Sequence, residues 1–216
     1  MVHAAQLIVL GSTKVGERTL VLHTLSSLWG RRGFLVTTGK GAAASLFLPL
    51  NILDAEVVEN PKSDLWRLRS IRSLYPLSGI RNDVRKNTVS LFMSEVLFRA
   101  VREGECEAGL FDWCRRSILT LDSLRSDYSN FHLLWLLELA GALGFSPTAE
   151  GLAPFAGDLY KEVLALLQSD FPGAMLLPLS GRIRSQIADA LLQYIGFHAE
   201  ISLEVRSLSV LRDLYS

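Results

Sequence analysis

The sequence is poor in the residues that build metal sites and disulfides. Only Cys106 and Cys114 occur among its 216 residues. No C-x-x-C pair is present, so one chain cannot assemble a four-cysteine zinc site. On a single helix the two cysteines would lie about 12 Å apart, which is too far for a disulfide. We therefore expect two buried, reduced thiols, no metal site and no cofactor.

Long hydrophobic runs are absent as well. The longest strongly apolar stretch, Leu133 to Phe145, contains Glu138 and is shorter than a membrane span. At the N-terminus, MVHAAQLIVLGSTK has no charged region before its short apolar run, so we expect no signal peptide. These features predict a cytoplasmic protein that does not bind membranes.

The signatures of common catalytic sites are missing. The histidines lie on separate predicted elements: His3, His23, His132 and His198. None has H-E-x-x-H spacing, and neither G-x-S-x-G nor G-x-G-x-x-G with an acidic partner occurs. His132 starts a predicted helix, where we expect capping or core packing, and His198 lies in a predicted loop without an assigned role. We predict that the chain is not an enzyme.

One glycine-rich stretch, GRRGFLVTTGKG from Gly30 to Gly41, invites comparison with a nucleotide-binding P-loop. That motif needs four residues between its glycines and a Ser or Thr after its lysine, at the start of a helix. Here five residues separate Gly33 from Gly39, and Gly41 stands in place of the hydroxyl residue. Pro49 follows soon after, and no helix start is evident. The stretch does not support a nucleotide-dependent enzyme.

What the sequence does contain is an uneven distribution of charge. The 22 basic and 22 acidic side chains cancel overall. Residues 1–100 nevertheless carry thirteen Lys and Arg against seven Asp and Glu, a net charge of +6, and the remainder carries −6. Opposed halves favour a polyanion-binding part joined to a part with another role. Chance, with a balancing surface, is the alternative.

Residues 1–75 predict a small β-barrel. Five short segments have strand character and are separated by turns rich in Gly or Pro: 5–13, 18–25, 33–38, 51–59 and 65–72. Strands of this length and spacing are typical of small barrels. In the fourth segment Leu53, Ala55 and Val57 share one face, and in the fifth Arg67 and Arg69 do so.

From Asp83 onward the hydrophobic period becomes helical. Helices are predicted over residues 83–103, 108–123, 130–143, 158–168, 180–194 and 204–214. Asn130 and Ser180 are expected to be N-caps, and Gly144 to be a C-terminal stop. We therefore predict an α+β fold, all-β and then all-α, with domains at 1–78 and 79–216.

The barrel's turns concentrate cations, which are the predicted nucleic-acid contacts. They are Lys14, Arg18, Arg31, Arg32 and Lys40. Small barrels bind single strands with a positive groove and stacking aromatic side chains. Trp29 and Phe34 offer flat faces, although core packing is the competing interpretation. Later in the chain, Arg182 and Arg184 flank an apolar helix start, where they would hold an acidic peptide tail or simply face solvent.

Four stretches together resemble a known family. They are QLIVLGSTKVGERTLVLHTLSSLWGRRGFLVTTGKG, DVRKNTVSLFMSEVLFRAVREGE, NFHLLWLLELAGALGFSPT and LLQYIGFHAEISLEVRSLSVL. In this order they resemble RecO, the bacterial recombination mediator. Many RecO proteins carry four cysteines between late helices, but GLAPFAG, Gly151 to Gly157, has none. The resemblance is therefore to the short form without zinc.

The resemblance implies an N-terminal OB-fold and a helical domain that recruits partners. It implies binding of single- and double-stranded DNA, annealing of complementary strands and a nucleoid-associated location. Its implied partners are a RecR-like protein, the acidic C-terminal tail of the single-strand-binding protein and, indirectly, RecA. The alternative is an OB-fold protein-interaction scaffold that does not bind DNA. Neither the partner pocket nor a preference between single and double strands can be placed from the sequence.

Overall fold

The computed structural model describes residues 1–38, 44–105 and 107–215. Five strands form a closed barrel in the order β1-β2-β3-β5-β4. Their bounds are β1 Val2–Lys14, β2 Thr19–Ser26, β3 Gly30–Thr37, β4 Ile52–Val58 and β5 Trp66–Ser73. The pairing of β3 with β5 is parallel, whereas the other pairings are antiparallel. The predicted barrel followed by helices is thus confirmed.

Alternation along the strands divides the barrel's side chains between two cores. Leu7, Leu22, Phe34 and Val57 point inward and are fully buried, as the period of two requires. Phe34 is therefore a core residue, as the competing interpretation had it. Ile8, the neighbour of Leu7, belongs instead to the core of the helices.

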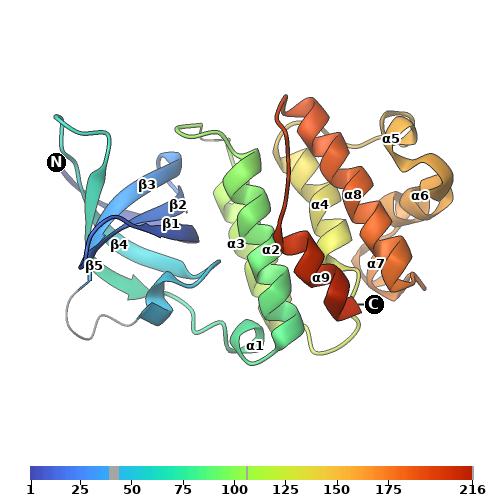
Figure 1. Ribbon diagram of the computed structural model, residues 1–216, viewed down its shortest axis with the longest axis horizontal. Coiled ribbons are helices and arrows are strands. Elements are labelled where there is room, and N and C mark those ends of the chain that lie inside the picture. Colours follow the sequence, from blue (N-terminus) through green and yellow to red (C-terminus); the bar gives the residue numbers. More distant parts are fainter. Residues whose placement is uncertain (39–43, 106, 216) are drawn as a thin grey trace.

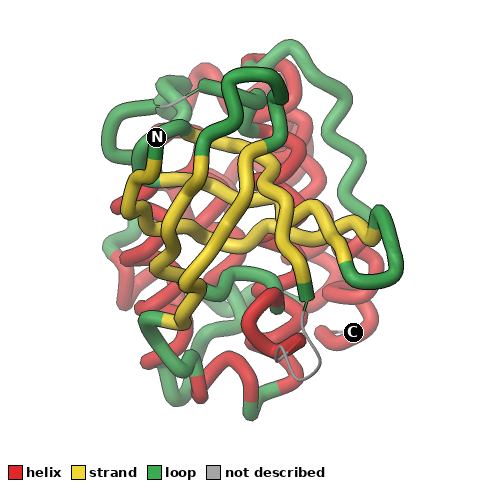
Figure 2. Tube along the Cα trace, turned by 90° about the vertical axis from the view of Figure 1, so that its left-hand side faces the viewer, coloured by secondary structure: helices red, strands yellow, loops and turns green. Residues whose placement is uncertain are grey.

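The helices cover the outer face of β1 and β2. They are α1 Ser78–Arg81, α2 Val84–Ala100, α3 Leu110–Ser123, α4 Phe131–Ala142, α5 Ala149–Ala156, α6 Tyr160–Gln168, α7 Phe171–Leu176, α8 Gly181–His198 and α9 Ser207–Tyr215. Short 3-10 turns occur at Ala44–Phe47 and Gly157–Leu159. In Figure 1, α2 and α3 lie between the barrel and helices α4 to α9, and Figure 2 shows the strands crossing in front of the helical layer.

One of the two cores spans the barrel and the helices. Ile8, Leu25 and Ile52 from the strands belong to the same buried cluster as Phe92 and Trp135 from the helices. Burial of this apolar surface holds the two parts in one orientation. The predicted division at residue 78 coincides with the start of α1, but its two separate domains stay a prediction.

Three helices were not predicted from the sequence, because each contains a residue that disfavours helices. Helix α1 contains Gly79, α5 contains Pro154 and α7 has Pro172 in its first turn. Gly79 is required by packing: a Cβ atom at this position would lie 2.0 Å from the backbone oxygen of Asp122. The link between the barrel and α2 therefore approaches the end of α3 backbone to backbone.

Asn130, Ser180 and Gly144 lie at the predicted helix ends, but the Asn130 side chain does not form a capping hydrogen bond. The Ser180 side chain caps α8 by accepting from the Ile183 amide, and Gly144 follows α4 at φ 89°. Asn130 does not cap α4 with its side chain. It is buried, and its amide group donates instead to carbonyls at the end of α7. His198 is the last residue of α8, not part of a loop.

Along the described stretches of chain, no helix has both the length and the apolar character needed to cross a membrane.

Candidate nucleic-acid interface

The structure does not bring the predicted cations together. Lys14 and Arg18 are exposed at the hairpin that joins β1 to β2. The Arg18 Nε donates to the Thr38 carbonyl at 3.3 Å. Arg32 lies six residues before Thr38, which is about 20 Å along an extended strand. Lys40 falls outside the described residues.

Arg31 joins the barrel to the helices. Its Nε donates to the Val101 carbonyl at 2.6 Å, and its guanidinium carbon lies 5.0 Å from the centre of the Phe98 ring. A longer ion pair of 3.9 Å reaches Glu103. Only 18% of the Arg31 side chain is exposed. Its hydrogen-bonding capacity is therefore directed at the connection between α2 and α3, and we leave it out of the interface.

Arg32 is oriented differently, because neighbouring residues of a strand point to opposite faces. Its guanidinium carbon lies 3.7 Å from the centre of the Trp66 ring. Its Nη2 donates to the Asp64 carbonyl at 3.0 Å. Trp66 and Trp29 are both half-buried, and their ring centres are 5.3 Å apart. Arg32 thus belongs to an aromatic cluster at the opposite end of the barrel from Arg18.

Two arginines on β5 were noted in the sequence but not assigned to the site. Arg67 and Arg69 are exposed on either side of the buried Leu68. Arg72, further along the same strand, donates to Asp54 at 2.6 and 2.9 Å. Among the described residues, Arg67 and Arg69 have no ion pair. The alternation in WRLRSIR is the signal that could have placed them in the interface.

Strand register places the arginines of β5 beside β3, the strand that also carries Arg32 and that ends next to Arg18. Arg67 pairs with Leu35 of β3, and Arg18 donates to Thr38. Three residues of extended chain separate those two points, or about 10 Å. We use the name seam for β3 and β5 with their flanking cations: Lys14, Arg18, Arg32, Arg67 and Arg69. The helical part contacts β3 at Arg31, through Val101 and residues 103–104, whereas Arg67 and Arg69 of β5 are exposed.

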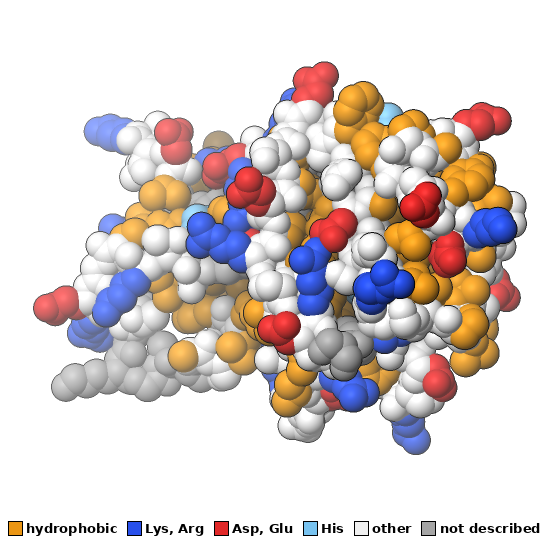
Figure 3. Space-filling view, turned by 45° about the vertical axis from the view of Figure 1, so that its right-hand side comes forward, with side chains coloured by type: hydrophobic (Ala, Val, Ile, Leu, Met, Phe, Trp, Pro, Cys, Tyr) orange, Lys and Arg blue, Asp and Glu red, His pale blue; other side chains and the backbone are white. Residues whose placement is uncertain are grey.

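The helical part does not show a comparable basic strip on the face seen in Figure 3. Lysines and arginines alternate there with acidic and hydrophobic side chains. The charge separation along the sequence therefore does not appear as a single basic face in this view. The cations of the seam are the more specific arrangement for a polyanion.

A small aromatic pocket lies between α3, α4 and α7. It has a volume of about 250 Å³. The Trp113 and Trp135 rings stack in its wall with centres 5.8 Å apart, and the exposed Arg116 stands at its edge. Trp135 is 2% exposed, and in the described part of the chain its Nε1–H has no acceptor. Glu138 also lines the pocket, and burial raises the pKa of its carboxyl despite a hydrogen bond from Trp113.

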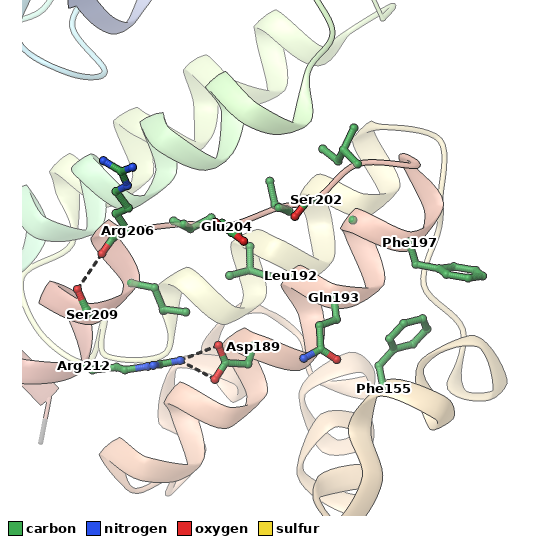
Figure 4. Close-up of a pocket in the computed structure, with 15 residues that line it drawn as sticks. Phe155, Asp189, Leu192, Gln193, Phe197, Ser202, Glu204, Arg206, Ser209 and Arg212 are labelled. Atoms are coloured by element: carbon green, nitrogen blue, oxygen red, sulfur yellow. Dashed lines mark hydrogen bonds and ion pairs between the residues drawn. The ribbon is translucent and has the colours of Figure 1, made fainter.

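A larger groove of about 820 Å³ runs between α8 and the segment before α9. Figure 4 shows Phe155 and Phe197 at one end, where their ring centres are 5.7 Å apart. At the other end Arg212 donates to both oxygens of Asp189. This internal pairing leaves the groove without a marked charge preference.

Comparison with known proteins decides the family. The family model for the C-terminal region of recombination protein O matches residues 81–152. A DNA repair protein RecO of Bacteroides fragilis is 32% identical over 169 residues, which cover 76% of this chain and 69% of the relative. Two further RecO proteins, of Phocaeicola vulgatus and Flavobacterium psychrophilum, are 26% and 27% identical and match over 97% of both chains. The chain belongs to the RecO family.

Membership in the RecO family gives the chain a role in DNA repair and recombination. The family-model match covers α2, α3 and α4 and reaches into α5, so it includes two walls of the aromatic pocket. The barrel with its seam lies outside that match, but the two relatives that match 97% of this chain cover it. The contact residues of this RecO protein therefore have to be argued from its own geometry.

The other predicted partner residues of this RecO chain lie at the start of α8. Arg182 is exposed. Arg184 is half-buried, and its Nη1 donates to the Leu179 carbonyl at 2.5 Å. Arg184 thus stabilises its own helix start. A role of these two arginines in binding a peptide tail stays a prediction.

Two buried titratable groups of this RecO protein, His132 and Cys114, are held in their neutral forms. His132 is 2% exposed, and desolvation lowers its pKa to about 3, so it stays neutral at physiological pH. Burial also raises the pKa of the Cys114 thiol, which keeps it protonated and unreactive. Within the described ranges, no three His, Cys, Asp or Glu side chains are grouped to hold a metal ion.

Proposed function

We propose that this RecO-family protein binds single- and double-stranded DNA through the seam and anneals complementary strands. The main support is a pair of exposed arginines on β5, Arg67 and Arg69, which form no ion pair with any described residue and lie where β5 pairs with β3. Arg18 and Lys14 extend the positive strip toward the β1–β2 hairpin.

The proposed mechanism is electrostatic. Lys and Arg side chains neutralise phosphates and release the counterions condensed on the DNA, with little dependence on sequence. A second strand approaching the bound one then meets reduced repulsion, because part of the phosphate charge is already compensated. Base pairing supplies the free energy of annealing, and the protein lowers the cost of bringing the strands together.

The proposed partners follow from family membership together with the aromatic pocket. An acidic C-terminal tail with a hydrophobic end, such as that of the single-strand-binding protein, would place its apolar side chain against Trp113 and Phe171. The Nε1–H of Trp135, which has no acceptor among the described residues, and the guanidinium of Arg116 would donate to its carboxylate or carbonyl groups. Cooperation with a RecR-like protein and assistance in loading RecA complete the proposed role.

The DNA proposal is tested with the double variant Arg67→Ala, Arg69→Ala. Affinity for a labelled single-stranded oligonucleotide is measured by fluorescence anisotropy at several salt concentrations. Loss of two phosphate contacts should flatten the slope of log K against log salt by about 1.4, since each contact on a single strand contributes about 0.7. Strand annealing should slow in parallel.

The control is Arg85→Ala with Arg125→Ala, which removes the same charge from exposed positions on the helical part. Equal effects of both double variants would show that net charge alone matters and would remove β5 from the site. If the unmodified protein fails to bind DNA even at low salt, the protein-interaction scaffold becomes the better description.

The partner proposal is tested with a peptide that copies an acidic, hydrophobic C-terminal tail. Trp135→Phe removes the N–H that has no acceptor among the described residues but keeps an aromatic ring, and it should weaken peptide binding roughly 10- to 100-fold, because one hydrogen bond to a charged group contributes about 1.5–3 kcal/mol. Arg182→Ala should leave binding unchanged. The reverse result would place the tail at the start of α8.

A further inference from the structure

The end of the barrel opposite the β1–β2 hairpin carries a cluster of aromatic rings around one arginine. Trp29, from the turn between β2 and β3, contacts His3, Phe34 and Trp66 edge-on, with ring centres 5.3–6.2 Å apart. The guanidinium carbon of Arg32 lies over the Trp66 ring. The start of β1 and the loop between β4 and β5 lie at this same end (Figure 1). We call these residues the barrel mouth: His3, Trp29, Arg32, Phe34 and Trp66.

The loops around the barrel mouth are held in place by their own side chains. In the β2–β3 turn, Ser26 Oγ accepts from the amides of Leu28 and Trp29 at 3.2 and 3.4 Å. In the β4–β5 loop, Asn60 Oδ1 accepts from the Lys62 amide and Ser63 Oγ from the Leu65 amide. The aromatic rings are therefore positioned before any ligand arrives, which lowers the entropic cost of binding.

Arg32 has most of its hydrogen-bonding capacity left over. A guanidinium carries five N–H donors, and the described residues supply a hydrogen bond to only one of its nitrogens, from the Asp64 carbonyl. The Nε–H is buried and has no acceptor within the described ranges. No described carboxylate forms an ion pair with Arg32. A stacked, uncompensated guanidinium at a half-open position calls for a ligand with a flat face and acceptor atoms.

We infer that the barrel mouth binds an unpaired nucleobase, which stacks on the Arg32 guanidinium as a third layer above Trp66. Bases stack on guanidinium planes as well as on aromatic rings. Arg67 follows Trp66 on β5 and would hold the adjoining phosphate. This inference rests on the proposed binding of DNA along the seam. It adds that the end of the seam at the barrel mouth contacts bases, not phosphates.

The inference makes single strands the preferred ligand of the barrel mouth. In a duplex the base faces are already stacked on one another, so none is open to a protein side chain at this position. The β5 arginines bind the backbone of either form. The protein should therefore bind single strands with a contribution that abasic DNA lacks.

The test uses two labelled single strands of equal length, one of ordinary nucleotides and one of abasic sites, which carry the same number of phosphates. The unmodified protein should bind the ordinary strand roughly 5- to 100-fold more tightly, the range that stacking of one base produces. Trp66→Leu should reduce this ratio toward one and leave the salt slope unchanged. Trp66→Phe, which keeps a ring under Arg32, should retain most of it.

The possible outcomes distinguish a failure of this inference from a failure of the proposed DNA binding along the seam. Equal binding of both strands by the unmodified protein, with a normal salt slope, overturns base stacking and leaves phosphate binding intact. Failure to bind either strand defeats the proposed function itself. If Trp66→Leu does not fold, as judged by its unfolding transition, the ratio is measured with Arg32→Lys instead. This variant keeps the charge but removes the flat donor group, so the ratio should fall. An unchanged ratio in a folded Arg32→Lys protein counts against the inference.

Discussion

Replacing Arg31 tests whether neighbouring arginines on β3 have different tasks. Arg31→Ala removes the 2.6 Å hydrogen bond to the Val101 carbonyl and the contact with the Phe98 ring. A hydrogen bond from a charged donor contributes about 1.5–3 kcal/mol, and a cation over an aromatic ring about 0.5–1 kcal/mol. The ion pair with Glu103 adds little, since it is 3.9 Å long and Glu103 is 63% exposed.

We expect Arg31→Ala to lower the free energy of unfolding by about 2–3 kcal/mol, because these contributions overlap and do not add fully. For a chain of this size that corresponds to a fall in Tm of roughly 5–10 °C. Urea unfolding followed by circular dichroism measures the change directly. The salt dependence of DNA binding, measured well below the Tm, should not change.

Arg31→Lys is the matched control. It retains the positive charge but cannot reproduce the guanidinium's hydrogen bond and stacking together. We expect it to be nearly as destabilised as Arg31→Ala. The reasoning is refuted if Arg31→Ala unfolds like the unmodified protein while its salt slope flattens, and if Arg31→Lys restores that slope. Arg31 would then be a phosphate contact, as the sequence alone had suggested.

Three further substitutions test how the helical part is assembled. Gly79→Ala should cost about 3 kcal/mol, because its Cβ atom would lie 2.0 Å from the Asp122 oxygen; unfolding by urea measures this, and a neutral result would mean that α1 shifts freely. Glu95→Gln should loosen α9, whose first amides and the Ser207 hydroxyl donate to the Glu95 carboxylate, and hydrogen exchange of α9 reports it. Desolvation raises the pKa of Glu95, but these hydrogen bonds outweigh it and the net pKa is lowered. Its stabilisation is therefore present above the ordinary carboxyl pKa and is lost as the pH falls through the lowered value, so unmodified and Gln proteins should converge in acid. Asn130→Ala should cost about 1–3 kcal/mol by leaving carbonyls at the end of α7 unpaired, and no loss of stability would show that water replaces the amide.

The sequence determined the architecture because its hydrophobic pattern is local. Alternation at Leu53, Ala55 and Val57 predicted one inward face of a strand, and all three are buried in the barrel core. The change to a helical period after Asp83 marked the start of α2, which Asp83 caps through the amides of Arg85 and Lys86. Both signals depend on neighbours within one or two turns of chain, so a single sequence is enough to read them.

The interpretation of Asn130 shows where local signals failed. Asn before a hydrophobic helix is a good cap by propensity. In the structure the same side chain is buried and satisfies carbonyls about 45 positions later in the chain, near α7. Burial makes those unpaired carbonyls more costly than an uncapped helix start. The side chain therefore makes long-range hydrogen bonds near α7 in place of the local capping hydrogen bond.

The interface was decided by the tertiary structure. Lys14, Arg18, Arg31 and Arg32 lie in connected turns of the sequence, yet successive turns of a barrel lie at opposite ends, and successive residues of a strand face opposite ways. Arg31 consequently contacts α2, whereas Arg32 contacts Trp66, 34 positions further along the chain. The seam exists because β3 closes the barrel against β5, a pairing between strands that do not follow one another. Periodicity specifies which face a side chain occupies, but only the register between distant strands specifies which faces meet.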